Sequence, residues 1–573
     1  MSNGLKIVQR SVDPARLARL QHFAPVVARA YAARGIEDPT QLSHGLDRLL
    51  PVGTLEGVEA AVELLLAHRT RATRVLVVGD FDADGATSSA LLVRGLRAYG
   101  FADVDFLVPN RFEYGYGLSP EIVALAAQRE PALIITVDNG ISSIEGVAAA
   151  RKLGIDVLVT DHHLPGAELP AANVIVNPNL PQATFGSRAL AGVGVAFYVL
   201  AALHRALADR HLPSPAQWLD LVALGTVADV VALDENNRVL VAQGLQRVRA
   251  GRCTPGVRAL LEVGGRSITD VVAADFGFAA GPRLNAAGRL DDMSLGIRCL
   301  ITDSPTEALA LASRLDQLNI ERRAIEAGMQ TQAMAAVKPL LAARRTDTPA
   351  RAGVCLYDPG WHQGVVGLVA GRVKERLRRP VIAFADAGEG LLRGSARSVE
   401  GVHVRDVLEA VSTQQPGLLL RYGGHAMAAG LTLEAARLDE FARAFEAQVL
   451  RFCPDGTLAD RIETDGALAL DELALPIAEA LRAAGPWGQA FPEPSFDQAF
   501  RIDRHRVVGE KHLKMRVEPE GSGRHFDAIA FNFFQGRERD APLPTRAHLV
   551  YRLGVNEYMG ERRLQLVVEH LLE

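Results

Sequence analysis

Five short apolar runs between residues 74 and 176 constrain the fold more than any other feature of the chain. Stretches with helical periodicity separate them, and the runs are RVLVVG (74–79), VDFLVP (104–109), LIITV (133–137), DVLVT (156–160) and NVIV (173–176). Apolar strands that alternate with helices are typical of a parallel sheet built from βαβ units. We therefore predict an α/β domain with a doubly wound parallel sheet.

A polar cluster follows each of the five runs. In chain order these clusters are DFDADG, NRFEYG, DNG, DHH and NPN. Open α/β sheets bind their ligands at the carboxyl ends of the strands. Five polar clusters at equivalent positions therefore predict one shared site at this edge of the sheet.

The first cluster, GDFDADGAT (79–87), has three interpretations. An EF-hand loop needs an acidic ligand at its twelfth position and a helix before it, whereas this chain has Leu91 there and a strand before it. A solvated turn is the second interpretation, because Asp and Gly are common turn residues. In the third, carboxylates two residues apart bind two adjacent metal ions.

Further acids and imidazoles at neighbouring strand ends favour the metal interpretation. Asp138 follows the third run, Asp161, His162 and His163 follow the fourth, and Asp229 lies in the apolar segment GTVADVV. Alone, each is more often a helix cap or a surface residue. Together, they would be costly to bury without a cation. Carboxylate oxygens with one or two imidazoles suit Mn²⁺ or Mg²⁺ better than zinc, so we expect a two-metal hydrolytic site.

The rest of the chain divides into further parts. Residues 305–338 predict one long connecting helix, with two shorter helices as the alternative, and a second α/β pattern begins at Gly353. Five short strands after residue 460 predict a small barrel, and an OB-fold is the expected kind. The predicted domains are a helical N-terminal segment (1–70), the parallel-sheet domain (71–300), the connecting helix (301–350), the second α/β domain (351–455) and the barrel (460–573).

Composition excludes several classes of protein. With 62 Lys and Arg against 67 Asp and Glu, the net charge of -5 excludes a globally basic nucleic-acid binder but allows a local basic groove. Segment 501–525 is such a candidate, since it holds seven basic and four acidic residues. The four cysteines form no CxxC pair, and no apolar run is long enough to span a bilayer. We expect a cytoplasmic protein without a membrane partner.

The ordered motifs GDFDADGAT, TVDNG, VTDHH and GTVADVV resemble those of the DHH phosphoesterase superfamily. GPRLNAAGRLDD (281–292), GSARS (394–398), YGGHAMAAG (422–430) and the terminal barrel make nearly the whole chain similar to the RecJ family. One departure is Phe81, where that family usually has Tyr. The resemblance implies a DHH domain, a long connecting helix, a DHH-associated domain and an OB-fold.

The resemblance also implies roles at the matching positions. Metal ligands would be Asp80, Asp82, Asp84, Asp138, His162 and Asp229, with Asp138 bridging two ions. Asp161 would orient an imidazole, and His163 would contact the scissile phosphate or transfer the leaving-group proton. Water would be the nucleophile, without a covalent protein intermediate.

Substrate binders are implied in the same way. Arg111, Ser395 and Arg397 would recognise a 5′-terminal phosphate, although Arg111 alone is equally typical of a surface arginine. Gly423, Gly424 and His425 fit a backbone turn that approaches a phosphate, or an ordinary turn. Backbone contacts of the DNA are expected from Arg283, Asn285 and Arg289.

The implied activity is 5′→3′ hydrolysis of single-stranded DNA to 5′-mononucleotides in DNA repair and recombination, with two Mn²⁺ or Mg²⁺ ions. Single-strand-binding protein and a RecQ-type helicase are the implied partners. Two alternatives stay open: a nano-RNase or small-phosphoester hydrolase of the same superfamily, and a DNA-binding scaffold without catalysis. The terminal barrel disfavours the first, and the complete acidic set disfavours the second.

Overall fold

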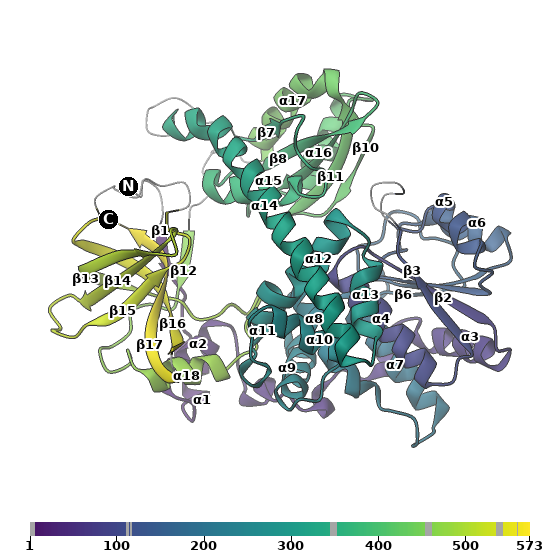
Figure 1. The fold of residues 1–573 in the computed structure, drawn as a ribbon, viewed down its shortest axis with the longest axis horizontal. Coiled ribbons are helices and arrows are strands. Elements are labelled where there is room, and N and C mark those ends of the chain that lie inside the picture. Colours follow the sequence, from purple (N-terminus) through teal and green to yellow (C-terminus); the bar gives the residue numbers. More distant parts are fainter. Residues whose placement is uncertain are drawn as a thin grey trace. The chain divides into compact units, whose positions relative to one another are not determined.

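In a computed structural model, the chain folds into two compact units. Figure 1 shows the fold. One contains residues 9–319, 464–533 and 542–573, and the other is built mainly from residues 320–463. The structure describes residues 6–109, 114, 117–343, 352–452, 461–534, 543–558 and 560–572. Within this part of the chain, no helix combines the length and the apolar character that a membrane crossing requires.

The first unit contains the predicted parallel sheet. Its strands are β2 (Arg74–Gly79), β3 (Asp103–Leu107), β4 (Leu133–Val137), β5 (Asp156–Thr160) and β6 (Val174–Val176). They are all parallel, in the order β3-β2-β4-β5-β6. The order reverses between β2 and β4, and this switch point is where such sheets bind ligands.

Helices cover both faces of this sheet, which confirms the doubly wound class (Figure 1). They are α3 (Val58–Thr70), α4 (Ala83–Ala98), α5 (Pro120–Ala127), α6 (Ile144–Lys152) and α7 (Gly192–Leu207). Helices α5 and α6 pack with alternate strand residues such as Leu76 and Ile134 in one core. Helices α3, α4 and α7 pack together over the opposite face.

A helical region follows the sheet and leads into the predicted long helix. It comprises α8 (Leu219–Ala228), α9 (Glu235–Arg249), α10 (Pro255–Val263), α11 (Ala273–Asp275), a π-helical turn η6 (Phe276–Ala280), α12 (Gly281–Leu290) and α13 (Ser294–Ile301). Helix α14 then runs as one element over Pro305–Ala343. This confirms the long-helix prediction against two shorter helices.

The second unit is the second α/β domain. Its strands are β7 (Val354–Tyr357), β8 (Val381–Gly388), β9 (Leu391–Arg397), β10 (Arg421–Gly424) and β11 (Ala428–Glu434), in the order β10-β11-β9-β8-β7. The helices are α15 (Val366–Leu377), α16 (Val404–Gln414) and α17 (Leu438–Phe452). Phe384, Phe441 and Phe445 lie in its core and bury the inner face of the sheet.

The C-terminal strands close into the predicted barrel. They are β13 (Phe496–Val508), β14 (His512–Pro519), β15 (Phe526–Ala530), β16 (Arg546–Tyr558) and β17 (Glu561–Leu572). The barrel order is β13-β14-β15-β17-β16, in which β15 and β17 are parallel and the other pairs are antiparallel. Closure pairs each of these strands on both sides.

The N-terminal segment has helices and one strand. Its elements are β1 (Lys6–Gln9), which pairs with β12 (Arg461–Thr464), α1 (Pro14–Arg19) and α2 (Pro25–Ala33). Arg34 forms an almost fully buried ion pair with Asp465 at 2.7 Å. The Tyr31 hydroxyl donates to the Ala484 carbonyl at 2.7 Å. These contacts hold the N-terminal segment against the linker that precedes the barrel. The linker includes α18 (Leu475–Ala483).

Candidate metal centre

The first acidic motif forms the junction between β2 and α4. Asp82 caps the helix by accepting hydrogen bonds from the amides of Asp84 at 2.9 Å and Gly85 at 3.0 Å. Asp is favoured at this position because its carboxylate satisfies unpaired amides of the first turn. Gly85 is required for space, since a Cβ there would lie 2.6 Å from the Asp80 carbonyl oxygen. The junction therefore brings three carboxylates to the end of β2.

Asp84 is fully buried, and the N-terminus of α7 holds its carboxylate. The Gly192 amide donates to Oδ2 at 2.6 Å and the Val193 amide donates to Oδ1 at 2.9 Å. Unpaired amides at a helix N-terminus stabilise a negative charge. A side chain on Gly192 would lie 2.7 Å from the Asp138 Cβ. The sequence analysis assigned no role to Gly192 and Val193, because they lie in an apolar stretch without a motif.

Asp138 enters the site from the end of β4 with a left-handed backbone, at a φ of 60°. The next residue, Asn139, stabilises this bend. Its side-chain amide donates to the carbonyl of Val78 at 3.2 Å and to that of Val137 at 2.8 Å. Asn139 therefore links the ends of β2 and β4 across the switch point. It was not predicted, because an Asn before Gly is typical of an ordinary turn.

The Asp161 carboxylate organises the loop that contains Asp161, His162 and His163. Its Oδ1 accepts from the amides of His162 and His163 and from His163 Nδ1 at 2.8 Å, and its Oδ2 accepts from the Ile141 amide. Burial opposes the charge, but the hydrogen bond from His163 and the two nearby imidazoles lower the pKa of Asp161. Asp161 thus orients the His163 imidazole and holds the backbone of both histidines.

The NPN segment (177–179) forms hydrogen bonds to the backbone of the same loop. The side-chain amide of Asn177 donates to the His163 carbonyl at 2.9 Å, and that of Asn179 donates to the His162 carbonyl at 2.6 Å. The fifth polar cluster therefore positions the backbone of the two histidines.

Potential ligand atoms form two groups that consist mainly of carboxylates, Asp80, Asp82 and Asp138 in one and Asp84, His162 and Asp229 in the other. A third group, Asp138, His162 and His163, overlaps both, and within each group the ligand atoms lie within 4.8 Å of one another. Asp138 joins them, because its Oδ1 lies 3.0 Å from His162 Nε2. His162 Nε2 also lies 3.6 Å from Asp229 and 3.9 Å from Asp84.

Burial and mutual repulsion disfavour the charged carboxylates without a cation. Burial, followed by the charges of neighbouring aspartates, raises the pKa of Asp84 and Asp138 well above the ordinary range. Burial and the Asp82 charge raise the pKa of Asp229 to about 7. Burial and the nearby His163 lower the pKa of His162 to about 4, which leaves it neutral and able to bind a metal.

In contrast to His162, His163 keeps its proton at neutral pH. Burial alone would lower its pKa, but the hydrogen bond to Asp161 and the surrounding carboxylates raise it to about 9. Its side chain is 43% exposed. In this cluster His163 is therefore a cation that solvent or a substrate can reach.

The donor set fits hard divalent cations. Two groups of carboxylate oxygens with one neutral imidazole match the preferences of Mn²⁺ and Mg²⁺, and no thiolate lies among them. Positive charge at these positions would offset the repulsion that raises the aspartate pKa values.

The residues expected to contact DNA near this centre have different surroundings. Arg111 lies outside the described residues. The Arg283 guanidinium forms an ion pair with Asp316 at 2.7 Å and donates to the Ala279 carbonyl, which ties α12 to α14. Asn285 Oδ1 accepts a hydrogen bond from the Ala83 amide at 2.8 Å. Asn285 thus supports the acidic junction directly.

In the other unit, Ser395 and Arg397 lie together on β9. Arg397 donates to the Ser395 hydroxyl at 3.0 Å. A Cβ on Gly367, in the first turn of α15, would lie 2.8 Å from both Ser395 Oγ and Arg397 Nη2. A helix N-terminus beside a hydroxyl and a guanidinium is suited to an anion. Gly367 was missed, although a glycine in a first helical turn signals a close approach.

Gly423 and Gly424 end β10, and His425 begins the hairpin to β11. All three residues are exposed. Gly424 has a φ of 140°, and a side chain there would lie 2.4 Å from the Ala428 carbonyl oxygen. A Cβ on Gly423 would meet nothing within 4 Å. The fold therefore needs glycine for space at position 424 and not at position 423.

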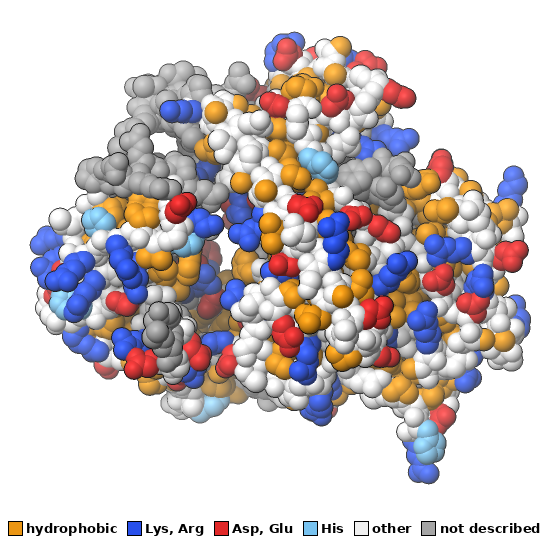
Figure 2. Space-filling model, viewed as in Figure 1, with side chains coloured by type: hydrophobic (Ala, Val, Ile, Leu, Met, Phe, Trp, Pro, Cys, Tyr) orange, Lys and Arg blue, Asp and Glu red, His pale blue; other side chains and the backbone are white. Residues whose placement is uncertain are grey.

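The barrel carries a basic ribbon, defined as Arg504, Arg506, Lys514 and Arg516 on β13 and β14. Arg504 lies opposite Arg516, and Arg506 lies opposite Lys514. Like charges opposite each other are unfavourable in a sheet. Lys514 also pairs with Asp527 at 3.4 Å. Figure 2 shows Lys and Arg side chains gathered over the barrel strands labelled in Figure 1. The basic excess of segment 501–525 is thus concentrated on one hairpin.

Comparisons with known proteins cover nearly the whole chain. Residues 74–226 match the DHH family N-terminal domain, residues 351–450 match the DHHA1 domain, and residues 464–570 match the RecJ OB domain. The chain is 54% identical to the single-stranded-DNA-specific exonuclease RecJ of Dickeya dadantii, over 95% of this chain and 96% of that protein. It is 50% identical to the Escherichia coli protein of the same name, over the full length of both.

Solved structures agree with this similarity. RecJ of Thermus thermophilus in complex with Mn²⁺ is 32% identical, has a TM-score of 0.81, and is matched over 100% of this chain and 80% of that one. The complex of the same protein with Mg²⁺ has a TM-score of 0.75 at 30% identity, over 98% of this chain and 77% of that one.

The raised aspartate pKa values predict an unusual dependence of stability on pH. An unfolded chain releases the Asp229 proton near pH 3.8, whereas the folded metal-free protein keeps it until about pH 7. The unfolded state then binds fewer protons, so this group lowers the free energy of unfolding as pH rises across that window. Saturating Mn²⁺ should therefore raise Tm by about 5–10 °C at pH 8 and by less at pH 5.5. Calorimetry measures both. An equal shift at both pH values, or the same shift in Asp229→Asn, would contradict the interpretation.

Asn285 should control metal affinity without being a ligand. Asn285→Ala removes the acceptor for the Ala83 amide, and we expect Mn²⁺ affinity to fall about 10–100-fold, as for other groups that orient ligands. Titration calorimetry with Mn²⁺ measures this. Asn285→Asp keeps an acceptor oxygen and is the matched control. An unchanged Mn²⁺ affinity in Asn285→Ala would show that Asn285 does not support the metal site.

Proposed function

The chain belongs to the RecJ family of single-stranded-DNA-specific exonucleases, and we propose that it removes nucleotides from the 5′ end with two divalent cations, Mn²⁺ or Mg²⁺, at the carboxylate cluster. The observation that carries this proposal is the pair of ligand groups joined by Asp138. When bound, such cations activate water and neutralise charge on the phosphate in an in-line displacement.

The protein's own side chains would hold the ions and would transfer one proton to the leaving oxygen. Asp80 and Asp82 would hold one ion, Asp84, His162 and Asp229 the other, and Asp138 both. Attack of water on the first internucleotide phosphate breaks its bond to the 3′ oxygen. His163, held through Nδ1 by Asp161, would donate the proton that this leaving oxygen needs. The released product is a nucleoside 5′-monophosphate.

The shortened strand keeps the attacked phosphate as its new 5′ end. Every turnover would therefore create a 5′-terminal phosphate for the next one. Ser395, Arg397 and the first turn of α15 would bind this group, together with the Gly423, Gly424 and His425 hairpin. Recognition of the end that the reaction regenerates would fix the 5′→3′ direction.

The basic ribbon on the barrel would bind the strand beyond the active site. Its guanidinium and ammonium groups suit the phosphate backbone of a single strand. Phe531 is exposed and packs edge-on to His512, so it offers an aromatic face beside this ribbon. In contrast, Arg283 and Asn285 would act on the centre through α12.

The central test is digestion of a single strand labelled at either end. With Mn²⁺, the wild-type protein should release labelled mononucleotide first from a 5′-labelled oligonucleotide and should leave duplex DNA intact. Asp82→Ala should lower activity at least about 1,000-fold, because it removes one ligand and the cap of α4. Release from the 3′ end, or full activity of Asp82→Ala, would overturn the proposal.

Recognition of the 5′ phosphate is tested separately at Arg397. Arg397→Ala should raise the KM for a 5′-phosphorylated oligonucleotide about 10–100-fold, because a charge-assisted hydrogen bond is lost. The KM for the first cleavage of a 5′-hydroxyl oligonucleotide should stay unchanged, because only later cleavages involve a 5′-terminal phosphate. Arg437→Ala, which breaks an exposed ion pair with Glu440 in the same unit, is the control. Equal losses on both substrates would argue against end recognition.

We also propose single-strand-binding protein and a RecQ-type helicase as partners, and the bacterial cytosol as the compartment. The partners rest on the family alone, whereas Cys253, Cys299 and Cys355 as free thiols agree with a reducing compartment. Single-strand-binding protein at saturation should speed digestion of a strand that forms hairpins, measured as initial rate. No change for any strand would argue against this partner.

A further inference from the structure

Two short backbone segments are next to the ligand group Asp84, His162 and Asp229. One is segment 189–193, which leads into the first turn of α7. The other is the connection 230–233, which runs from Asp229 at the end of α8 to α9. The positions of these two segments relative to each other therefore affect the geometry of the whole group.

Segment 189–193 contacts two of the three ligands through its backbone. Its amides at the start of α7 donate to the Asp84 carboxylate. Burial is the main cause that lowers the pKa of His162, and a hydrogen bond of its ring with the Leu190 backbone raises it. Any shift of this segment would therefore move Asp84 and His162 together.

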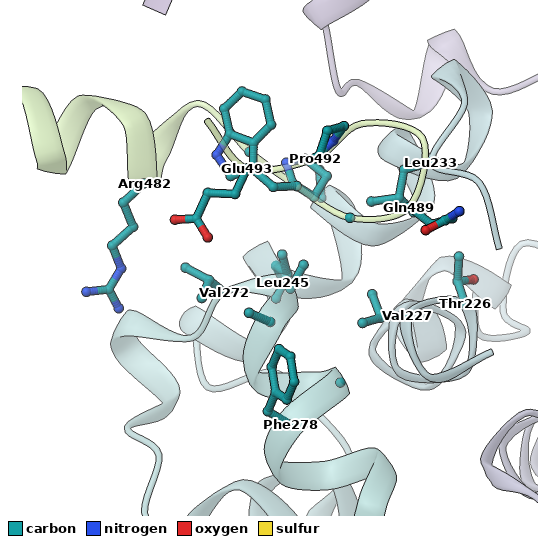
Figure 3. Close-up of a pocket in the computed structure, with 18 of the residues that line it drawn as sticks. Thr226, Val227, Leu233, Leu245, Val272, Phe278, Arg482, Gln489, Pro492 and Glu493 are labelled. Carbon is teal, nitrogen blue, oxygen red and sulfur yellow. The ribbon is translucent and has the colours of Figure 1, made fainter. Parts of the chain in front are cut away.

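The connection 230–233 has an open space on one side. Val230 has a φ of 63°, which is rare for a β-branched residue, and it lines a cavity of about 520 Å³ together with Leu233. Leu233 lies near Gln489 in the wall of this cavity, and its amide donates to the Gln489 carbonyl at 2.8 Å (Figure 3). Because apolar packing is incomplete on this side, hydrogen bonds have to hold the connection in place.

Asn237, in the first turn of α9, joins the two segments. Its side-chain amide donates to the Ala189 carbonyl at 2.6 Å and to the Ala232 carbonyl at 2.9 Å. The side chain is fully buried, and its Oδ1 accepts no hydrogen bond from the described residues. Asn237 therefore acts through its two N–H donors, in surroundings where such bonds are stronger than in water.

Ser187 and Asp234 form a second link between the same parts of the chain. The buried Ser187 hydroxyl donates to Asp234 Oδ2 at 2.5 Å, and the Asn237 backbone amide donates to Asp234 Oδ1 at 2.9 Å. Asp234 thus caps α9 and holds its first turn beside the chain that leads into α7. This link keeps Asn237 in reach of both carbonyls.

We propose that Asn237 is a positioning residue for the cation held by Asp84, His162 and Asp229. It would fix the distance between the segment that holds the first two ligands and the turn that carries the third. The other ligand group lies at the ends of β2 and β4, which the hydrogen bonds of Asn237 do not reach. The inference rests on the proposed function only in assigning these three ligands to one cation.

Titration calorimetry of the full-length protein with Mn²⁺ tests this role. The wild-type protein should bind two ions. Asn237→Ala should weaken one of them about 10–100-fold and leave the other unchanged, as expected for a group that orients ligands. Asp229→Asn should weaken the same ion, so the double variant should lose less affinity than the sum of the two single losses.

Asn236→Ala is the matched control, because Asn236 is buried in the same turn of α9. Its Oδ1 accepts hydrogen bonds from the Leu50 amide at 3.0 Å and the Tyr198 hydroxyl at 2.8 Å, outside the two segments. This variant should lower Tm and keep both Mn²⁺ affinities. If Asn237→Ala does not fold, Ser187→Ala removes only the second link and should weaken the same ion about two- to tenfold.

Equal losses at both ions, the same selective loss in Asn236→Ala, or unchanged affinities in Asn237→Ala would overturn the proposal. With single-stranded DNA, Asn237→Ala should also need about 10–100-fold more Mn²⁺ for half-maximal activity. A wild-type protein that binds two Mn²⁺ ions but digests no DNA would contradict the proposed function. The calorimetric result would still decide the role of Asn237.

Discussion

The repulsion among the carboxylates at the ends of β2 and β4 is the constraint on which the site depends. Asp84 and Asp138 are almost completely buried, and their raised pKa values show how strongly this arrangement disfavours their charges. The fold offsets part of that cost with the amides of Gly192 and Val193, which donate to the Asp84 carboxylate. The rest requires cations, so metal binding and the geometry of the active centre are one property of the fold.

Much of this arrangement could be predicted from local sequence. The five apolar runs encode the parallel sheet, and the polar residues after them encode its ligand edge, because both follow from strand periodicity. The supporting residues could not be predicted in this way. Gly192 and Asn285 act through hydrogen bonds to residues 108 and 202 positions away along the chain. No local pattern distinguishes such a residue from an ordinary helical glycine or asparagine.

The net charge of -5 combines opposite charges with separate functions. The acidic cluster would attract a phosphate only after cations occupy it, whereas the proposed role of the basic ribbon on the barrel is to attract the strand without metal. In sequence, segment 501–525 shows only an excess of basic over acidic residues. In the structure Arg501 is paired with Glu518 and Arg524 bonds the Leu470 carbonyl. The remaining charge lies mainly on one face of the β13–β14 hairpin.

The most direct measurement of the central claim is anomalous X-ray scattering from crystals of the protein with Mn²⁺ and a 5′-phosphorylated oligonucleotide. Two manganese peaks should appear about 3.5–4 Å apart. One should lie among Asp80, Asp82 and Asp138, and the other among Asp84, His162 and Asp229, with Asp138 between them. A single peak, or peaks away from these carboxylates, would contradict the account.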